Sequence, residues 1–232
     1  MARIIFSLAS LLVIAACGGS SEETPTTLGP ASAVDVLAKA GPVLQGLESV
    51  RFRIEVDGDP VFIDGAELLA ASSAEGQYQA PASFQAVVQV KVFGITAEVG
   101  AINIGEDQWI TNPITSEWER LPPDFGFDPL TLFDPDIGLG AMLAGGVEGA
   151  EFTGPSEGVV SYAITGTLQG SQVEVITAGL VAEPEVEILV SIDATTSHVE
   201  QVTFDTGGGT SQWTVSFSDF DEPVTIEPPE TE

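Results

Sequence analysis

Apolar and polar residues alternate along most of this chain, and this period of two predicts β-strands. In residues 50–56 every second side chain is apolar, and charged residues occupy all three positions between them. The same alternation is clear in residues 84–92 and 213–217. Short turn sequences such as residues 105–107 separate neighbouring strands, and hairpins of this kind produce antiparallel pairing. The pattern predicts about ten strands in one antiparallel sheet, which must twist and curl at this width.

Two further features of the sequence predict a turn and a frayed C-terminal tail. Glu75 and Gly76 predict a turn between a strand at residues 61–71 and the strand that begins near Phe84. The residues from Asp221 onward are acidic and rich in proline, which predicts a frayed C-terminal tail.

Two segments near the ends of the strand pattern carry helical signals. Residues 32–47 begin with Ser32, and Asp35 stands at the reciprocal position of a capping box. Gly41 and Pro42 are expected to kink or interrupt this helix. Ser171 and Glu174 form a second capping box before a short helix to about Leu180, although the β-branched residues there leave a strand as the alternative.

Residues 125–147, in the middle of the chain, do not alternate and contain no Lys or Arg. Asp128-Pro129 and Asp134-Pro135 each place a capping carboxylate before a proline at a first helical position. A helix over residues 137–144 would be apolar on nearly every side, apart from two glycines that leave a flat strip for close approach to a sheet or a ligand. Such a helix is buried in a core or forms a lid over an apolar cavity, and both interpretations remain open.

Residues 1–16 have the features of a secretory signal: an early Arg, an apolar run too short to span a bilayer, and small residues before the cleavage site. Residues 14–17 (IAAC) fit a bacterial lipobox, so Cys17 is predicted to become an N-terminus that carries acyl chains such as palmitate. An ordinary cleavage site with an incidental cysteine is the alternative. Residues 17–30 then form a polar tether.

The charge balance is strongly acidic, with 35 Asp and Glu against 6 Lys and Arg and a formal net charge of −29. This balance argues against nucleic acid as a partner, because binding it requires basic residues to neutralise phosphates. An anionic membrane surface would also repel the domain, so the lipid anchor must hold it in an extracytoplasmic position. The single cysteine excludes a disulfide within one chain.

The sequence offers little catalytic chemistry. His198 is the only histidine, and there is no G-x-S-x-G motif for a serine hydrolase. Residues 57–59 (DGD) and 134–136 (DPD) do not have the spacing of an EF-hand loop, and turn or cap roles explain them. We therefore expect no enzyme, no metal site and no cofactor.

Several segments together resemble a known family. Residues 33–40 (AVDVLAKA), 46–54 (GLESVRFRI), 130–143 (LTLFDPDIGLGAML) and 218–226 (SDFDEPVTI) follow the lipobox and tether in the order found in the LppX/LprAFG lipoproteins of mycobacteria. The resemblance implies an α+β domain over residues 31–226, before an acidic tail at 227–232. Its fold would be a single strongly curved antiparallel sheet, a half-barrel of the LolA/LolB type, with a few helices on the concave face around an apolar cavity.

The resemblance also implies a function. Such a protein holds the acyl chains of lipids or glycolipids in its cavity during envelope lipid transport, and a membrane transporter is a candidate partner. This favours the lid interpretation of residues 125–147. The residues expected to line the cavity are Phe52, Ile54, Val88, Val90, Val92, Leu132, Phe133, Ile137, Met142, Leu143, Tyr162 and Ile164. Two alternatives remain: a structural or adhesive envelope lipoprotein with a fully packed core and a protein partner, and an accessory sensor for a membrane kinase or transporter.

Overall fold

The computed structural model describes residues 32–62, 69–92, 94–112, 115–122, 129–177, 179–206 and 208–230. The strands in these residues are β1 (Ser49–Gly58), β2 (Val61–Phe62), β3 (Leu69–Gln79), β4 (Ser83–Val92), β5 (Ile95–Ile104), β6 (Asp107–Thr111), β7 (Trp118–Arg120), β8 (Glu148–Phe152), β9 (Ser161–Gln169), β10 (Glu185–Asp193), β11 (Val199–Thr206) and β12 (Ser211–Ser218). The helical elements are α1 (Ala33–Gln45), the 3-10 helix η1 (Pro129–Phe133), α2 (Leu139–Gly145) and α3 (Gly170–Ile176).

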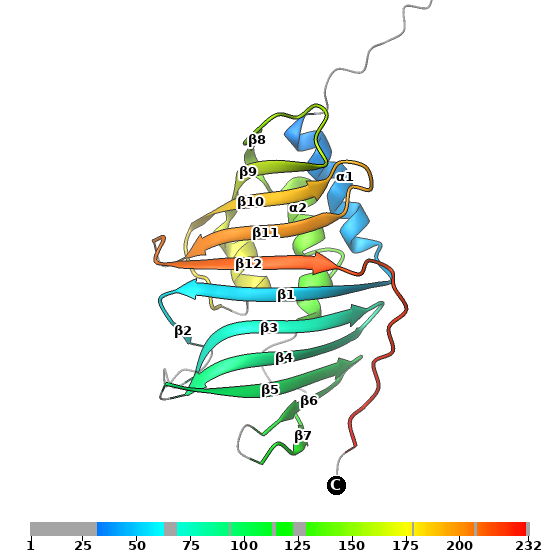
Figure 1. Cartoon of the computed structure of the whole chain (residues 1–232), viewed down its shortest axis with the longest axis vertical. Coiled ribbons are helices and arrows are strands. Elements are labelled where there is room, and N and C mark those ends of the chain that lie inside the picture. The colour runs from blue at the N-terminus through cyan, green and yellow to red at the C-terminus, as the bar shows by residue number, and fades with distance from the viewer. Residues whose placement is uncertain are drawn as a thin grey trace, which may run out of the picture.

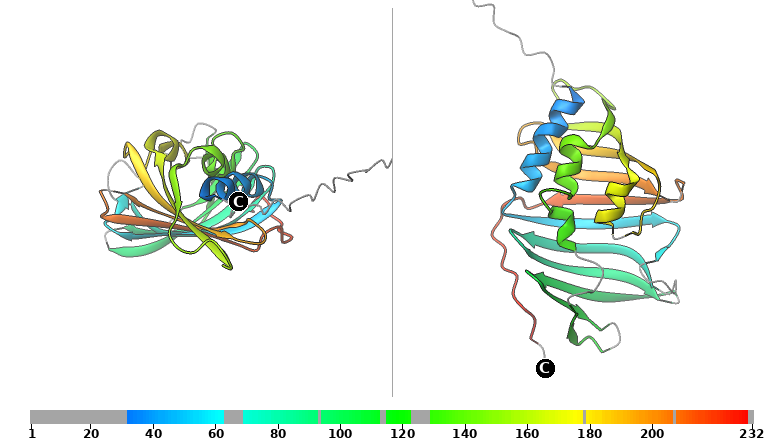
Figure 2. Two further views of the ribbon diagram at one scale, coloured as in Figure 1. Left: turned by 90° about the horizontal axis from the view of Figure 1, so that it is seen from above. Right: turned by 180° about the vertical axis from the view of Figure 1, so that it is seen from behind.

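All described strands belong to one antiparallel sheet. Their order is β7-β6-β5-β4-β3-β1-β12-β11-β10-β9-β8, and β2 pairs with β3. β7 and β8 therefore lie at opposite edges, and the sheet stays open (Figure 1). The helices lie on one side of this curved sheet (Figure 2). The predicted α+β half-barrel is confirmed, with twelve described strands in place of about ten. β8 was not anticipated, because its EGAEF sequence has no regular alternation.

The turn expected at Glu75 and Gly76 is wrong, because both residues lie inside β3. Gly76 pairs with Phe52 on one side and with Ala86 on the other. A Cβ atom on Gly76 would lie 2.6 Å from Cζ of Phe52. The Gln85 carbonyl oxygen of β4 would be closer still, at 2.2 Å, so glycine is needed here because a neighbouring backbone and an aromatic ring leave no room for a side chain, and its presence does not mark a turn.

The capping box of α1 is confirmed. The Ser32 hydroxyl accepts a hydrogen bond from the Asp35 backbone N–H at 3.1 Å, and the Asp35 carboxylate accepts one from the Ser32 N–H at 3.2 Å. Pro42 lies inside the helix, so α1 is not interrupted there. The helix at residues 170–176 is also confirmed, but it has no side-chain cap and begins after Gln169, so the expected capping box at Ser171 is wrong.

The central stretch forms η1 and α2. Asp128 lies outside the described residues, and Pro129 opens η1. The Asp134 carboxylate accepts hydrogen bonds from the backbone N–H groups of Asp136, at 2.8 Å, and Ile137, at 3.0 Å. It therefore caps the turn before α2, while α2 itself begins two residues later than expected and has no side-chain cap.

The C-terminal segment is ordered against the sheet, so the expectation that it frays from Asp221 is wrong. The Asp221 carboxylate accepts a hydrogen bond from the Glu48 N–H at 2.7 Å, and Gln79 donates one to the Val224 carbonyl at 2.9 Å. Ile226 is buried in a second, smaller hydrophobic cluster with Ile102 and Trp109. No described helix combines the length and apolar composition needed to cross a membrane.

Candidate functional site

The apolar side chains expected to line a cavity occupy one face of the sheet. Residues that pair directly in an antiparallel ladder lie on the same face. One row of such pairs crosses nine strands: Val99, Val88, Ala74, Ile54, Val215, Val202, Val190, Ile164 and Phe152. Every member of this row is apolar, so the face is apolar from β5 to β8.

Burial divides this row into two halves. Val215, Val202, Val190 and Ile164, which we call the covered half, are buried. They belong to the main hydrophobic core, together with helix residues such as Leu143. Figure 2 shows the helices over this part of the sheet. The covered half is therefore a conventional packed core between helices and sheet.

The other part of the same face is mixed: Phe52, Phe84, Ala86 and Val90 are buried, while a further set of apolar residues is partly exposed. Its members come from β1 to β5 and are only partly buried: Ile54, Val61, Ala71, Ala74, Val88, Ala97 and Val99. We call these residues the open half. Val61, Ala71 and Ala97 share a second row with the buried Val90. Among the described helical elements, α1, α2 and α3 lie over the covered half, and η1 reaches as far as β4.

Phe133 of η1 stands at the boundary between the two halves. Its ring stacks on Tyr78 of β3, with centroids 4.0 Å apart, and it meets Phe217 of β12 edge-on at 6.5 Å. Its centroid lies 6.3 Å from that of Phe52. Burial raises the pKa of the Tyr78 phenol above its usual value. Leu132 packs beside Phe133 against the same core. These contacts close the packed core on the side that faces the open half.

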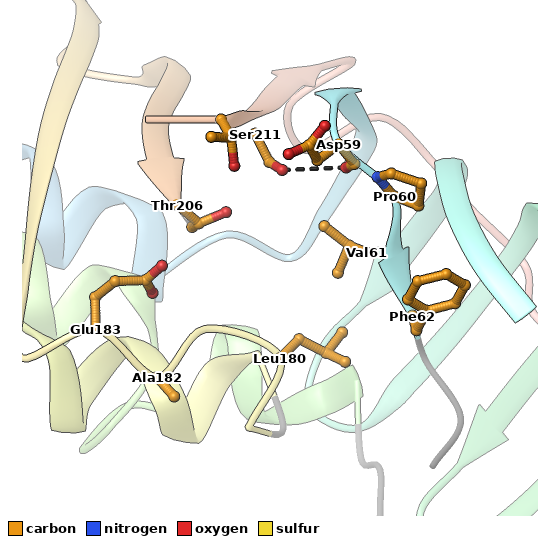
Figure 3. A pocket seen from close by; sticks show the side chains of 10 residues that line it. Asp59, Pro60, Val61, Phe62, Leu180, Ala182, Glu183, Thr206 and Ser211 are labelled. Carbon is orange, nitrogen blue, oxygen red and sulfur yellow. Dashed lines mark hydrogen bonds between the residues drawn. The ribbon is translucent and has the colours of Figure 1, made fainter. Parts of the chain in front are cut away.

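A cavity that is largely open to solvent lies where β1 and β2 meet the loop that follows α3 (Figure 3). Its volume is about 490 Å³. We call it the strand-end cavity; it is lined by Asp59, Pro60, Val61, Phe62, Leu180, Ala182, Glu183, Thr206, Thr210 and Ser211. Because Val61 also belongs to the open half, the cavity adjoins the half-exposed apolar surface.

The opposite face of the sheet is polar. A hollow of about 440 Å³ there contains Arg51, Arg53 and Glu75. Arg53 pairs with Glu75 at 2.6 Å, and Arg51 pairs with Asp219 at 2.7 Å. Both arginines of this hollow are therefore paired with carboxylates, and the apolar face is the better candidate for a ligand.

The family model of the LppX_LprAFG lipoproteins matches residues 31–226. The chain belongs to the LppX_LprAFG lipoprotein family. Two solved structures share its fold. LprF from Mycobacterium bovis is 19% identical, with a TM-score of 0.67 over 85% of this chain and 96% of that one. LppX from Mycobacterium tuberculosis is 18% identical, with a TM-score of 0.59 over 84% of this chain and 98% of that one. No curated protein is a significant match to the chain.

Most of the remaining residues expected to line a cavity pack against other parts of this LppX_LprAFG lipoprotein. Met142 and Leu143 are buried in the main core with Ile164. Tyr162 is half-buried beside Phe152, with ring centroids 5.6 Å apart. These residues pack against protein, so they are not available as a free wall in this structure.

Three further residues of the predicted sites are exposed or lie outside the described part of the chain. Ile137 precedes α2 and is 49% exposed, so it is not part of the core that contains Met142 and Leu143. Cys17 and the side chain of Val92 lie outside the described residues.

Several residues of the open half were missed by the sequence reasoning. Ala71, Ala74 and Ala97 carry small side chains, which give almost no hydrophobic signal in a strand pattern. An alanine next to Val88 or Ile54 fills less of this face than a larger residue would. Only the pairing of β3, β4 and β5 shows that these alanines share one face.

Proposed function

We propose that this protein binds the acyl chains of lipids or glycolipids on the open half of the sheet face, and carries or presents them within the cell envelope. One observation supports the proposal most directly. A single apolar row is buried beneath helices from β12 to β9 but remains half-exposed from β1 to β5. An extended apolar surface of this kind on a folded domain is typical of a binding site.

An acyl chain fits the chemistry of the open half. It requires only apolar contacts, which Ile54, Val88 and Val99 supply, and room, which the neighbouring alanines leave. Each methylene removed from water contributes about 0.8 kcal/mol, so a long chain binds firmly without any charged contact. No catalytic group or cofactor is part of this proposal.

The family membership and the sequence together support a membrane-anchored position. We infer that residues 1–16 are removed as a signal peptide and that Cys17 carries acyl chains in the membrane. Residues 17–30 would then tether the domain, which begins at α1. A membrane transporter remains a candidate partner that supplies or accepts the lipid.

A second candidate function is a structural or adhesive lipoprotein with a protein partner. The packing of the covered half supports it, because its apolar side chains are already buried against helix residues. In this case a protein would cover the open half, and the purified chain would contain no lipid.

Two neighbouring valines on β4 separate these candidates. Val88 faces the open half, while Val87 is 44% exposed on the opposite face. We expect the detergent-free mature chain to carry lipid that mass spectrometry detects, Val88→Trp to lose most of it, and Val87→Trp to keep it. Val90→Trp is a poorer test, because Val90 is 1% exposed and a larger side chain there would cost about 1–3 kcal/mol by overpacking. A lipid-free wild type, or equal lipid in both variants, would contradict the proposal.

A further inference from the structure

We propose that two copies of this chain join edge to edge through β5, so that their open halves form one continuous apolar surface. The contact is isologous, because the same segment of both copies takes part in it. The inference rests on the proposed function only for the use of that surface by a lipid. The pairing itself follows from the backbone and the charges of β5.

The first half of β5 has a free edge. β4 pairs with β5 over its full length, but β6 pairs only with residues 101–104. The Gly100 N–H points to the β6 side, where it donates to the Thr111 hydroxyl at 2.7 Å. Backbone groups of successive residues in an antiparallel strand point alternately to the two sides, so Thr96 and Glu98 direct theirs to the same side as Gly100. No described residue pairs with them there.

The outer edges of the sheet are protected against pairing, and this edge is not. β7 is three residues long and carries Glu119 and Arg120. β8 carries Glu148 and Glu151, and its register shifts between them. Short length, charged side chains and bulges are the features that prevent edge-to-edge association. Residues 95–99 have regular pairing with β4 and a single charged side chain, so another strand can add to them.

An antiparallel pairing of two β5 strands centred on Ala97 satisfies this edge. It places Thr96 opposite Glu98 of the second copy, so the outward backbone groups of both residues form hydrogen bonds. It also places Ile95, which is 71% exposed, opposite Val99 of the second copy on the apolar face. Centring on Glu98 would set two carboxylates against each other, and centring on Thr96 would leave Glu98 opposite the turn before β5. The Ala97 register therefore connects the two open halves.

Charge also favours β5 as the place where two copies of this acidic chain meet. The formal net charge of −29 opposes association between copies. Residues 76–97, however, contain no Asp or Glu and only one Lys, Lys91. Lys91 pairs with Thr96, so in this register it lies on the same face as Glu98 of the second copy, two strands away. Each copy contributes one cation and one anion, and the contact is therefore balanced in charge.

A single cysteine at the centre of the pairing tests the register. Residues that face each other as a non-hydrogen-bonded pair have Cα atoms about 4.5 Å apart, so Ala97→Cys can form a disulfide with its own copy. Thr96→Cys is the matched control, because position 96 would lie about 8 Å from its own copy, too far for a disulfide. With mild oxidation of the membrane-anchored full chain, we expect Ala97→Cys to give at least about fivefold more linked dimer than Thr96→Cys. The unsubstituted chain, whose only cysteine is Cys17, gives the background.

A second pair of variants tests the backbone hydrogen bonds. In the Ala97→Cys chain, Thr96→Pro removes an outward N–H and none of the bonds to β4, so the linked dimer should fall at least about fivefold. Thr96→Ala keeps the N–H and should leave the linked dimer unchanged. If Thr96→Pro lowers the melting temperature, Ile95→Lys replaces it; this side chain is already exposed, and the new charge would face Val99 of the second copy. Equal linking at positions 96 and 97, or linking that survives both Thr96→Pro and Ile95→Lys, would overturn the inference.

The lipid content of the same samples separates this inference from the proposed function. It is measured by mass spectrometry on the unsubstituted chain, where no cross-link is needed. A chain that contains lipid but gives no linked dimer overturns the inference alone. A chain that links through Ala97→Cys but contains no lipid overturns the proposed function and leaves the β5 pairing in place.

Discussion

Gly41 of α1 and Gly140 of α2 approach each other through their backbones. A Cβ atom on Gly41 would lie 2.4 Å from the Gly140 carbonyl oxygen, and one on Gly140 would lie 2.8 Å from the Gly41 carbonyl oxygen. The flat strip expected at Gly140 therefore faces another helix, and neither the sheet nor a ligand. This contact fixes how closely the two helices pack over the covered half.

Substitution at this contact should destabilise the domain. We expect Gly41→Ala to lower the free energy of unfolding by about 1–3 kcal/mol, because the new methyl group meets backbone atoms that cannot move independently. Gly145→Ala is the control: it lies in α2 with nothing within 4 Å of the added Cβ, and should be neutral or stabilising. Urea unfolding of both variants measures the difference, and equal effects would contradict the close packing.

The stacking of Phe133 on Tyr78 should appear as a coupling free energy. Leucine substitutions at both positions in a double-mutant cycle should give about 0.5–1.5 kcal/mol of coupling, because stacked rings contribute beyond their buried area. Tyr78→Leu combined with Phe204→Leu should instead be additive, since those rings belong to separate contacts. Additivity in the first pair would mean that η1 does not seal the core as described.

The buried C-terminal segment predicts a stability effect far from the helices. Ile226→Asp should cost at least about 2 kcal/mol, because it removes an apolar side chain from the cluster with Ile102 and Trp109 and introduces a charge. Thr225→Asp, one residue earlier and exposed, should have almost no effect. If the two variants unfold at the same urea concentration, the tail does not pack in solution.

The anchor prediction concerns Cys17. Cys17→Ser should abolish acyl labelling and leave the chain uncleaved or released from the membrane, because a serine hydroxyl cannot replace the lipidated thiol. Ser20→Ala in the tether should leave labelling and membrane retention unchanged. Membrane fractionation with radiolabelled fatty acid measures both, and labelling of the Cys17→Ser variant would refute lipidation at this position.

The pKa of Asp193 predicts one pH dependence. Hydrogen bonds from the Thr196 N–H, the Thr196 hydroxyl and the Thr195 N–H stabilise its carboxylate and lower its pKa below 3.8. The stability that follows is present above the unfolded-state pKa and is lost as pH falls through the lowered folded-state pKa. The stability difference between the wild type and Asp193→Asn should therefore shrink on acidification below about pH 4. NMR titration of the carboxyl carbon gives the pKa directly.

Local sequence rules account for much of the fold. The capping box at Ser32 and Asp35 depends on residues three apart, and the structure reproduces it. The alternation in residues 50–56 and 84–92 predicts both the strands and the choice of face, because successive side chains in a strand point in opposite directions. Phe52, Ile54, Val88 and Val90 consequently share the predicted face.

Distant contacts decided the features that local rules predicted wrongly. Gly76 continues a strand because it pairs with Phe52 of β1 and Ala86 of β4, and its missing side chain leaves room for the Gln85 carbonyl and the Phe52 ring. Val224 and Ile226 are held because Gln79 and Trp109 lie beside them. None of these partners is near in sequence, so no local pattern could reveal the contacts.

The sequence by itself determined that one face of the sheet is apolar and assigned Phe52, Ile54, Val88 and Val90 to it, because a period of two assigns each residue of a regular strand to a face. Only the tertiary structure decided that Val190 and Val202 are buried while Ile54 and Val88 on the same row stay half-exposed. The reason is that burial depends on which helix lies over which strand. That placement is set by contacts such as the one between Gly41 and Gly140, which no single strand or helix encodes.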